Sequence, residues 1–154
     1  MVVEPNAREP ERFPSLLRRA RRAYARAIQA GLAEAGFDDV PRNGAYVLAA
    51  SAREGAQLSQ IITELAVSKQ AAGQLIETLV SRGYLDRSVD PQDRRRLTIS
   101  RTERGAAAAA VIGAAVGEVD ARLRQRVSAD HVEHAREVLG ALADLAAEPA
   151  RPGS

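Results

Sequence analysis

The sequence of 154 residues contains no cysteine, which excludes disulfides, thiolate nucleophiles and cysteine-based redox sensing. It also contains no uninterrupted apolar run of about 18 residues, the length that a membrane-spanning helix requires. Its first residues, MVVEPNAREPERF, are charged and lack the apolar centre of a signal peptide. These absences predict a cytoplasmic protein that has no membrane partner.

Aromatic residues make up only 3% of the chain although 45% of it is hydrophobic, because much of the apolar content is alanine. An alanine-rich helix buries little area, so stability requires extensive contact between helices, including contact between subunits. The length suits one domain of ordinary size, or a core with extensions. The net charge of +2 does not by itself indicate a nucleic-acid partner.

The sequence also lacks the arrangements that mark an enzyme site. It has no glycine-rich phosphate loop, and its two histidines lie close together, so no pairing of a nucleophile with a base is recognisable. We predict that the protein is not an enzyme and carries no cofactor. His131 and His134 stand one helical turn apart beside acidic residues, and such a pair can bind zinc. We interpret this segment as a charged helix surface and predict no metal site, with a metal-responsive regulator as the alternative.

Helical periodicity dominates the chain. Pro14 stands in the first turn of a helix whose apolar residues recur at helical spacing until Gly36. A second, shorter helix is predicted to open at Pro41 and to end before Gly55. The spacing predicts three more helices apart from the one that follows Ser68, at residues 58–66, 103–127 and about 129–147.

A winged helix-turn-helix is predicted in the middle of the chain. Ser68 is a favourable N-cap for a helix over 69–82, which Gly83 closes. Two strands follow, at 84–89 and 95–100. Two short helices joined by a tight turn and followed by a hairpin are typical of this fold. The predicted fold class is therefore mainly α with a small β-hairpin, a winged helix-turn-helix core flanked by further helices.

The second helix of this pair is the candidate recognition helix. Its apolar stripe leaves Ser68, Lys69, Gln70, Gly73 and Gln74 directed away from the core. Glutamine can pair bidentately with adenine, lysine can reach guanine or phosphate, and the free N–H groups at the helix start suit a phosphate. A glycine inside a helix costs about 1 kcal/mol against alanine, and close approach to DNA would explain it. The alternative is a merely solvated polar face.

The hairpin RSVDPQDRRRLTIS concentrates positive charge at its centre. Arg94, Arg95 and Arg96 repel one another unless an anion lies nearby, and an arginine in a narrow minor groove gains from the negative potential there. Asp93 is placed to orient Arg95 through a bidentate pair. We therefore predict that Asp93, Arg94 and Arg95 belong to a DNA interface, with Arg95 as its principal contact. The alternative is an arginine-rich solvated loop.

The stretch LSQIITELAVSKQAAGQLIETLVSRGYLDRSVDPQDRRRLTISRTERG resembles the DNA-binding core of the multiple-antibiotic-resistance regulator (MarR) family of bacterial transcription factors. The resemblance rests on AVSKQAAGQL, then LVSRGYLDR, then the aspartate-x-arginine at Asp93 and Arg95, then T-x-x-G at Thr102–Gly105. The flanking helices match the family's dimerisation region in position, so the resemblance covers about residues 13–147. At position 101, before T-x-x-G, many members have leucine and this chain has arginine. This difference bears on the local packing of the strand onto the helix and not on the fold.

The resemblance implies a homodimer whose first and last helices intertwine. It implies a double-stranded DNA operator of pseudo-palindromic sequence, with Arg95 in the minor groove and the helix after Ser68 in the major groove. It further implies repression that a small ligand, often aromatic and anionic, relieves by binding between the dimer helices and the DNA-binding lobe. The residues expected to line that crevice are Arg18, Arg22, Tyr24, Phe37 and Tyr46.

The alternative function is that of a winged-helix module that binds protein rather than DNA.

The expected organisation divides the chain into five parts. These parts are a disordered lead-in at 1–12, N-terminal dimerisation and support helices at 13–52, the DNA-binding lobe at 53–101, C-terminal dimerisation helices at 102–147 and a disordered tail at 148–154.

Overall fold

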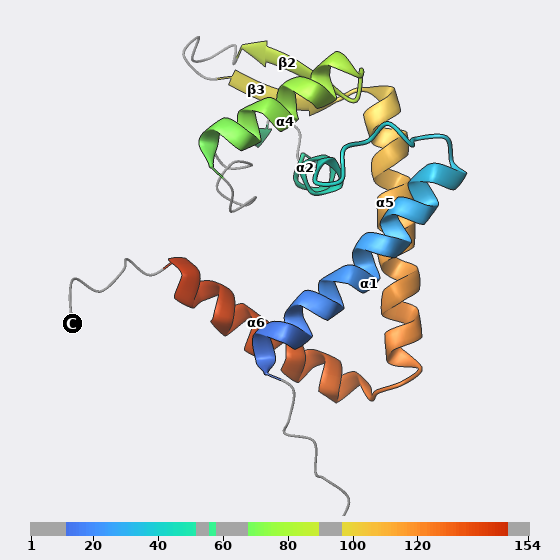
Figure 1. Ribbon diagram of the computed structural model, residues 1–154, viewed down its shortest axis with the longest axis vertical. Coiled ribbons are helices and arrows are strands. Elements are labelled where there is room, and N and C mark those ends of the chain that lie inside the picture. The colour runs from blue at the N-terminus through green and yellow to red at the C-terminus, as the bar shows by residue number, and fades with distance from the viewer. Residues whose placement is uncertain (1–11, 52–55, 58–67, 90–96, 148–154) are drawn as a thin grey trace, which may run out of the picture. The chain divides into compact units, whose positions relative to one another are not determined.

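The computed structural model describes residues 12–51, 56–57, 68–89 and 97–147 (Figure 1). They form a mainly helical fold with one small antiparallel sheet, as the sequence predicts. The chain divides into two compact units, residues 1–117 and 118–154, and the boundary lies within helix α5 (Glu103–Arg124). The helix expected at 58–66, most of the lead-in and the tail lie outside the described residues.

The first unit combines helices with a winged hairpin. Its strands form a sheet in the order β1-β3-β2, and both neighbouring pairs are antiparallel. The β2–β3 register runs from Leu85 opposite Arg101 to Val89 opposite Leu97. Helix α4 contacts both β2 and α2, and Figure 1 shows it alongside the hairpin. Besides the first part of α5, the described elements are α1 (Phe13–Glu34), α2 (Gly44–Ala50), β1 (Ala56–Gln57), α4 (Lys69–Ser81), β2 (Leu85–Val89) and β3 (Leu97–Arg101).

Helix α1 matches its prediction, and α2 is shorter than predicted. Proline stands in the first turn of α1, and Gly36, with φ of 80°, follows its end in the left-handed conformation that glycine adopts readily. The prediction that α2 opens at Pro41 was wrong, because the helix begins at Gly44. Pro41 instead starts a turn, in which the Gly44 N–H donates to the Pro41 carbonyl at 2.7 Å. Proline suits the start of a turn as well as the start of a helix, and the sequence alone does not separate the two.

The core of the first unit lies between its helices and the inner face of the sheet. Ala72, Ile76 and Leu79 of α4 are fully buried at the spacing of one helix face, and Leu75 and Val80 are partly buried beside them, so the predicted inward face is confirmed. The largest fully buried side chains are those of Leu32, Val47, Leu48, Ile76, Leu79, Tyr84, Leu85 and Ile99.

The second unit contains the end of α5 and the helix α6 (Ala129–Ala147). Val138, Leu142 and Leu145 recur at helical spacing on one face of α6, yet 51%, 39% and 61% of their surfaces are exposed. Exposed apolar side chains in a row are a feature of interaction surfaces. In the part of the chain that the structure describes, no helix has the length and apolar character needed to cross a membrane.

Candidate nucleic-acid interface

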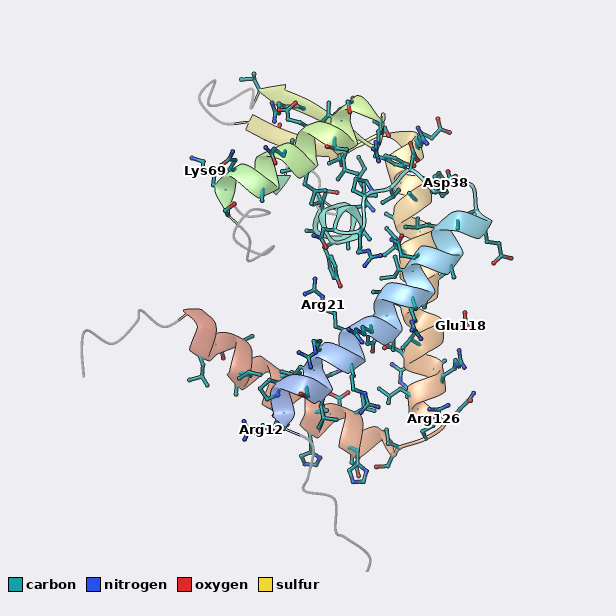
Figure 2. All side chains as sticks on the ribbon, in the orientation of Figure 1. Arg12, Arg21, Asp38, Lys69, Glu118 and Arg126 are labelled. Atoms are coloured by element: carbon teal, nitrogen blue, oxygen red, sulfur yellow. The ribbon has the colours of Figure 1, made fainter. Side chains whose placement is uncertain are left out.

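Helix α4 presents the polar face that the sequence predicts. Ser68 is its N-cap, since the Ser68 hydroxyl oxygen accepts a hydrogen bond from the Ala71 N–H at 3.2 Å. Lys69, Gln70 and Gln74 are exposed, because the opposite face of the helix is buried. Figure 2 shows Lys69 at the beginning of the helix. The predicted readers therefore share one accessible surface.

Gly73 of α4 has no internal contact that requires a glycine. A Cβ atom added at Gly73 would meet nothing within 4 Å. The free protein thus has room for alanine at this position, although glycine in a helix interior costs about 1 kcal/mol relative to alanine. The open space beside Gly73 would let a partner approach the helix backbone closely, which is a physical reason for glycine at this position.

The β2–β3 hairpin is fastened to the exposed side of α4. Arg87 of β2 forms an ion pair with Glu77 of α4, with 2.6 Å between Nη1 and Oε1. Across the strands, the hydroxyl groups of Ser88 and Thr98 lie 2.8 Å apart. Arg87 offsets a negative charge on the face that carries the glutamines. Sequence reasoning missed this pair, because nothing in one sequence indicates which charges of a helix and a following strand will meet.

The predicted wing residues Asp93, Arg94 and Arg95 lie outside the described residues. The strand ends on either side of them, Val89 and Leu97, pair with each other. The segment 90–96 therefore connects the two far ends of the hairpin.

Four side chains meet at the other end of the hairpin, and we name them the hairpin-base cluster: Asp39, Arg82, Tyr84 and Arg104. The Tyr84 hydroxyl donates to a carboxylate oxygen of Asp39, and Arg82 donates to the Asp39 carbonyl. The Nη2 of Arg104 donates to both carboxylate oxygens of Asp39 at 2.9 and 3.1 Å and to the Tyr84 hydroxyl at 3.1 Å. Its Nη1 donates to the Arg82 carbonyl at 2.8 Å.

The electrostatics of the hairpin-base cluster favour its charged and hydrogen-bonded form. The guanidinium carbon of Arg104 lies 4.3 Å from the centre of the Tyr84 ring, a cation–π contact. Burial and the hydrogen bond to Asp39 raise the pKa of Tyr84 to about 12. The hydrogen bond from Tyr84 and the charges of Arg104 and Arg82 hold the pKa of Asp39 below its ordinary value, against the opposing effect of burial.

The T-x-x-G stretch, residues 102–105, connects the hairpin to α5 and is held by hydrogen bonds on both sides. The Thr102 hydroxyl donates to the Gly83 carbonyl at 2.6 Å and accepts from the Gly105 N–H at 3.0 Å, so Thr102 caps α5. A Cβ atom at Gly105 would lie 1.9 Å from the Tyr84 carbonyl oxygen, which requires glycine there. Arg101 keeps its place at the end of β3, opposite Leu85, so its departure from leucine leaves this strand pairing intact.

The residues expected to line a ligand crevice fall into separate contacts. Tyr46 of α2 meets Arg21 of α1, with 3.4 Å between the Nε and the hydroxyl oxygen and 5.4 Å from the guanidinium carbon to the ring centre. Figure 2 shows Arg21 directed from α1 toward α2. Phe37 instead packs edge-on against Tyr84 at 6.2 Å. Sequence reasoning named the two arginines flanking this position and missed Arg21, although the three arginines share one helix face.

The predicted crevice residues Arg18 and Arg22 are exposed on α1, and Tyr24 is half-buried there. The two histidines lie on α6, where the Nδ1 of His131 is 2.6 Å from the Ser128 hydroxyl and the Nδ1 of His134 is 2.7 Å from the Asp130 carbonyl. Among the described residues, no group of three or more histidine or acidic side chains is arranged to hold a metal ion.

Comparison with known proteins finds one family model and several solved structures that are similar to this chain. The model of the MarR family matches residues 38–96, a span that begins beside the hairpin-base cluster and includes α4 and β2. The PcaV transcriptional regulator from Streptomyces coelicolor, solved with its natural ligand, has the same fold, with a TM-score of 0.71 at 21% identity over 92% of this chain and 99% of that one. The chain resembles the MarR family in the sequence of residues 38–96 and in its fold.

Two further MarR-like structures have the same fold. The MepR–DNA complex from S. aureus has a TM-score of 0.71 at 20% identity, over 88% of this chain and 98% of that one. The structure of Bordetella bronchiseptica BpsR, whose DNA binding is regulated by 6-hydroxynicotinic acid, has a TM-score of 0.70 at 21% identity, over 90% of this chain and 98% of that one. No curated protein matches the sequence.

Proposed function

We propose that this chain is a MarR-family, sequence-specific, DNA-binding transcriptional regulator. The single observation that carries the proposal is the exposed polar face of α4, with Lys69, Gln70 and Gln74 beside the β2–β3 hairpin. An α-helix fits the major groove, where glutamine pairs bidentately with adenine and lysine reaches guanine or phosphate. The MepR–DNA complex supports the proposal, because that protein has the same fold.

The regulator acts as a homodimer in the bacterial cytoplasm, without enzymatic activity or cofactor. The apolar stripe of α6 and the exposed side chains of Phe13 and Leu16 at the start of α1 support a dimer, because a second copy would cover them. A two-fold dimer places its two recognition helices on half-sites one helical turn apart, which requires a pseudo-palindromic operator. Binding at such a site within a promoter represses transcription by excluding polymerase.

A small aromatic anion relieves repression by favouring a dimer whose recognition helices no longer match the operator. The contact between Arg21 and Tyr46 supports this part of the proposal, because a carboxylate can take over the guanidinium while its ring stacks on the tyrosine. The test adds 6-hydroxynicotinic acid, the ligand of BpsR, and benzoate to the protein–operator complex. Release of DNA by neither compound would leave the proposed class of effector without support.

The central experiment measures binding to random and selected duplexes. A duplex of about 30 bp accommodates two half-sites one turn apart. The wild-type chain should select a common sequence from a random pool, and the logarithm of its affinity should fall steeply and linearly with the logarithm of the salt concentration. A winged helix used to bind protein would select no sequence and would have no such slope.

A further inference from the structure

Arg104 is a cation beside the hairpin whose guanidinium is engaged inside the protein. Its side chain is 44% exposed, so its position alone would allow contact with a phosphate. Both of its terminal nitrogens nevertheless donate to other groups, Nη1 to the Arg82 carbonyl and Nη2 to Asp39 and Tyr84. The guanidinium carbon also lies over the Tyr84 ring. A side chain fixed by this many contacts is costly to withdraw toward a ligand.

These contacts join three segments that are distant in sequence. Asp39 belongs to the connection between α1 and α2, Tyr84 directly precedes β2, and Arg104 lies in the first turn of α5. The two residues that pair at the base of the hairpin are Leu85 and Arg101, and they lie between Tyr84 and the start of α5. The hairpin-base cluster therefore fixes the direction in which the hairpin leaves the core.

We propose that Arg104 is a positioning residue for DNA binding, which sets the direction of the β2–β3 hairpin through Asp39 and Tyr84 and does not itself contact DNA. The proposal rests on the proposed function as a DNA-binding regulator.

The length of the hairpin makes its base important. Four residue steps separate the pair at the base from the pair formed by Val89 and Leu97. At about 3.4 Å a step, a tilt of about 10° at the base displaces the far end by about 2 Å. Hydrogen bonds tolerate a spread of only about 0.5 Å in length, so a displacement of this size separates any contact that the hairpin makes with DNA.

The test measures the affinity of the full-length chain for the duplex that the wild type selects, by fluorescence anisotropy at several salt concentrations. Arg104→Gln and Asp39→Asn should each weaken binding by about tenfold, and the double variant by about the same factor rather than a hundredfold, because both changes remove one interaction. The weakening by Asp39→Asn is informative, since the loss of a negative charge alone would strengthen binding to DNA.

Two variants of the same cluster separate positioning from charge. Arg104→Lys keeps the charge, but one ammonium cannot reach Asp39 and the Arg82 carbonyl while lying over the Tyr84 ring, so it should not restore the affinity. Tyr84→Phe changes no charge and keeps the ring, and it should weaken binding by about threefold. Arg124→Gln removes the same charge from the other end of α5 and serves as the matched control.

A direct phosphate contact would give different results. The salt slope would fall by about one in Arg104→Gln, and lysine would restore the affinity, and either result overturns the proposal. Wild-type affinity in Arg104→Gln or Asp39→Asn overturns it as well. If these two variants fail to fold, as judged by circular dichroism, Tyr84→Phe decides, and its wild-type affinity would exclude positioning. A wild-type chain that binds no duplex refutes the proposed function itself, which is apparent before any variant is made.

Discussion

Gly73 and Gly105 both lie inside helices, but their surroundings differ. A Cβ atom at Gly105 would collide with the Tyr84 carbonyl, so glycine there serves the packing of α5 against the hairpin. Nothing lies within 4 Å of a Cβ atom at Gly73, so glycine there serves no internal packing. Glycine is thus required by the fold at position 105 and, by our proposal, by the approach of DNA at position 73.

Gly73→Ala should therefore stabilise the free protein and weaken its binding to DNA. Alanine fits the helix and should raise the free energy of unfolding by about 0.5–1 kcal/mol, measured by urea denaturation. Its methyl group would hold the helix away from the groove, which should lower operator affinity severalfold. Gly113→Ala on α5, where a Cβ atom also meets nothing within 4 Å, is the control and should stabilise without affecting DNA binding. Unchanged operator affinity in Gly73→Ala would contradict the close approach.

Tyr84 should make stability depend on pH in the alkaline range. Its pKa is raised to about 12 in the folded protein, above the value of about 10 in an unfolded chain. The folded state thus retains the proton more strongly, so this contribution is complete below about pH 10 and is lost as the pH rises toward 12. Urea denaturation at a series of alkaline pH values should show this decline in wild type and in Tyr46→Phe. A decline just as steep in Tyr84→Phe would assign the effect to other groups.

At the scale of elements, α4 combines a buried face that the core requires with an exposed face that the core does not use. Ala72, Ile76 and Leu79 fix the rotation of the helix, and this rotation directs Gln70 and Gln74 outward. By our proposal, the rigidity of the buried face would allow the exposed face to read bases, because a base contact requires side chains held at a fixed place.

Gln74→Ala should lower the affinity for the selected operator by about 1–3 kcal/mol and change the affinity for random duplex little. The physical reason is that a bidentate contact to a base edge exists only on the matching sequence. Gln125→Ala, which removes an exposed glutamine near the end of α5, should leave both affinities unchanged. Equal losses of affinity on operator and random duplex would mean that Gln74 does not read sequence.

The hairpin is the second element of the proposed interface, and its charged residues remain a prediction. Arg95→Ala should lower the salt slope of binding by about one, since a phosphate-lined groove loses one cation. Asp93→Ala should weaken binding although it makes the hairpin more positive, because Asp93 orients Arg95. Arg94→Ala should have a smaller effect than Arg95→Ala, since neighbouring residues of a strand face opposite sides. Anisotropy titrations at several salt concentrations measure all three. Wild-type binding by Arg95→Ala would refute this assignment.

At the scale of the whole molecule, the composition and the exposed apolar residues both favour a homodimer. Few aromatic residues and much alanine leave a single chain little means of covering α6, whose Val138, Leu142 and Leu145 are exposed. By our proposal, a second copy of the chain covers this surface, and folding would then be coupled to dimerisation.

Leu142→Lys should disrupt the dimer. A lysine in the middle of an apolar interface must be desolvated without a partner, which disfavours association by several kcal/mol, on the order of 3. Sedimentation velocity should show a dimer for wild type, and monomer or aggregate for Leu142→Lys. Asp144→Lys places the same residue on another face of α6 and should remain dimeric. A dimeric Leu142→Lys protein would exclude this face of α6 from the interface.

The sequence by itself determined the long helices and the two hairpin strands, because their signals are local. Apolar residues at helical spacing predicted α1, α4, α5 and α6 within a few residues, Ser68 marked the start of α4, and Gly83 marked its end. The polar face of α4 followed from the same periodicity, since the buried stripe dictates which side chains remain outside. The ordered set of motifs also predicted the resemblance to the MarR family, whose model matches residues 38–96. The start of α2 was misplaced because proline opens turns and helices alike.

Only the tertiary structure decided which distant side chains meet. Asp39 and Arg104 are separated by 65 residues, and Arg21 and Tyr46 by 25. No periodicity encodes such contacts, because they depend on how helices cross and on the path of the connections between them. The need for glycine at position 105 likewise arises from a carbonyl group 21 residues earlier in the chain, at Tyr84, which the folded hairpin brings against α5. Local patterns thus specify what each element is, and packing specifies which side chains act together.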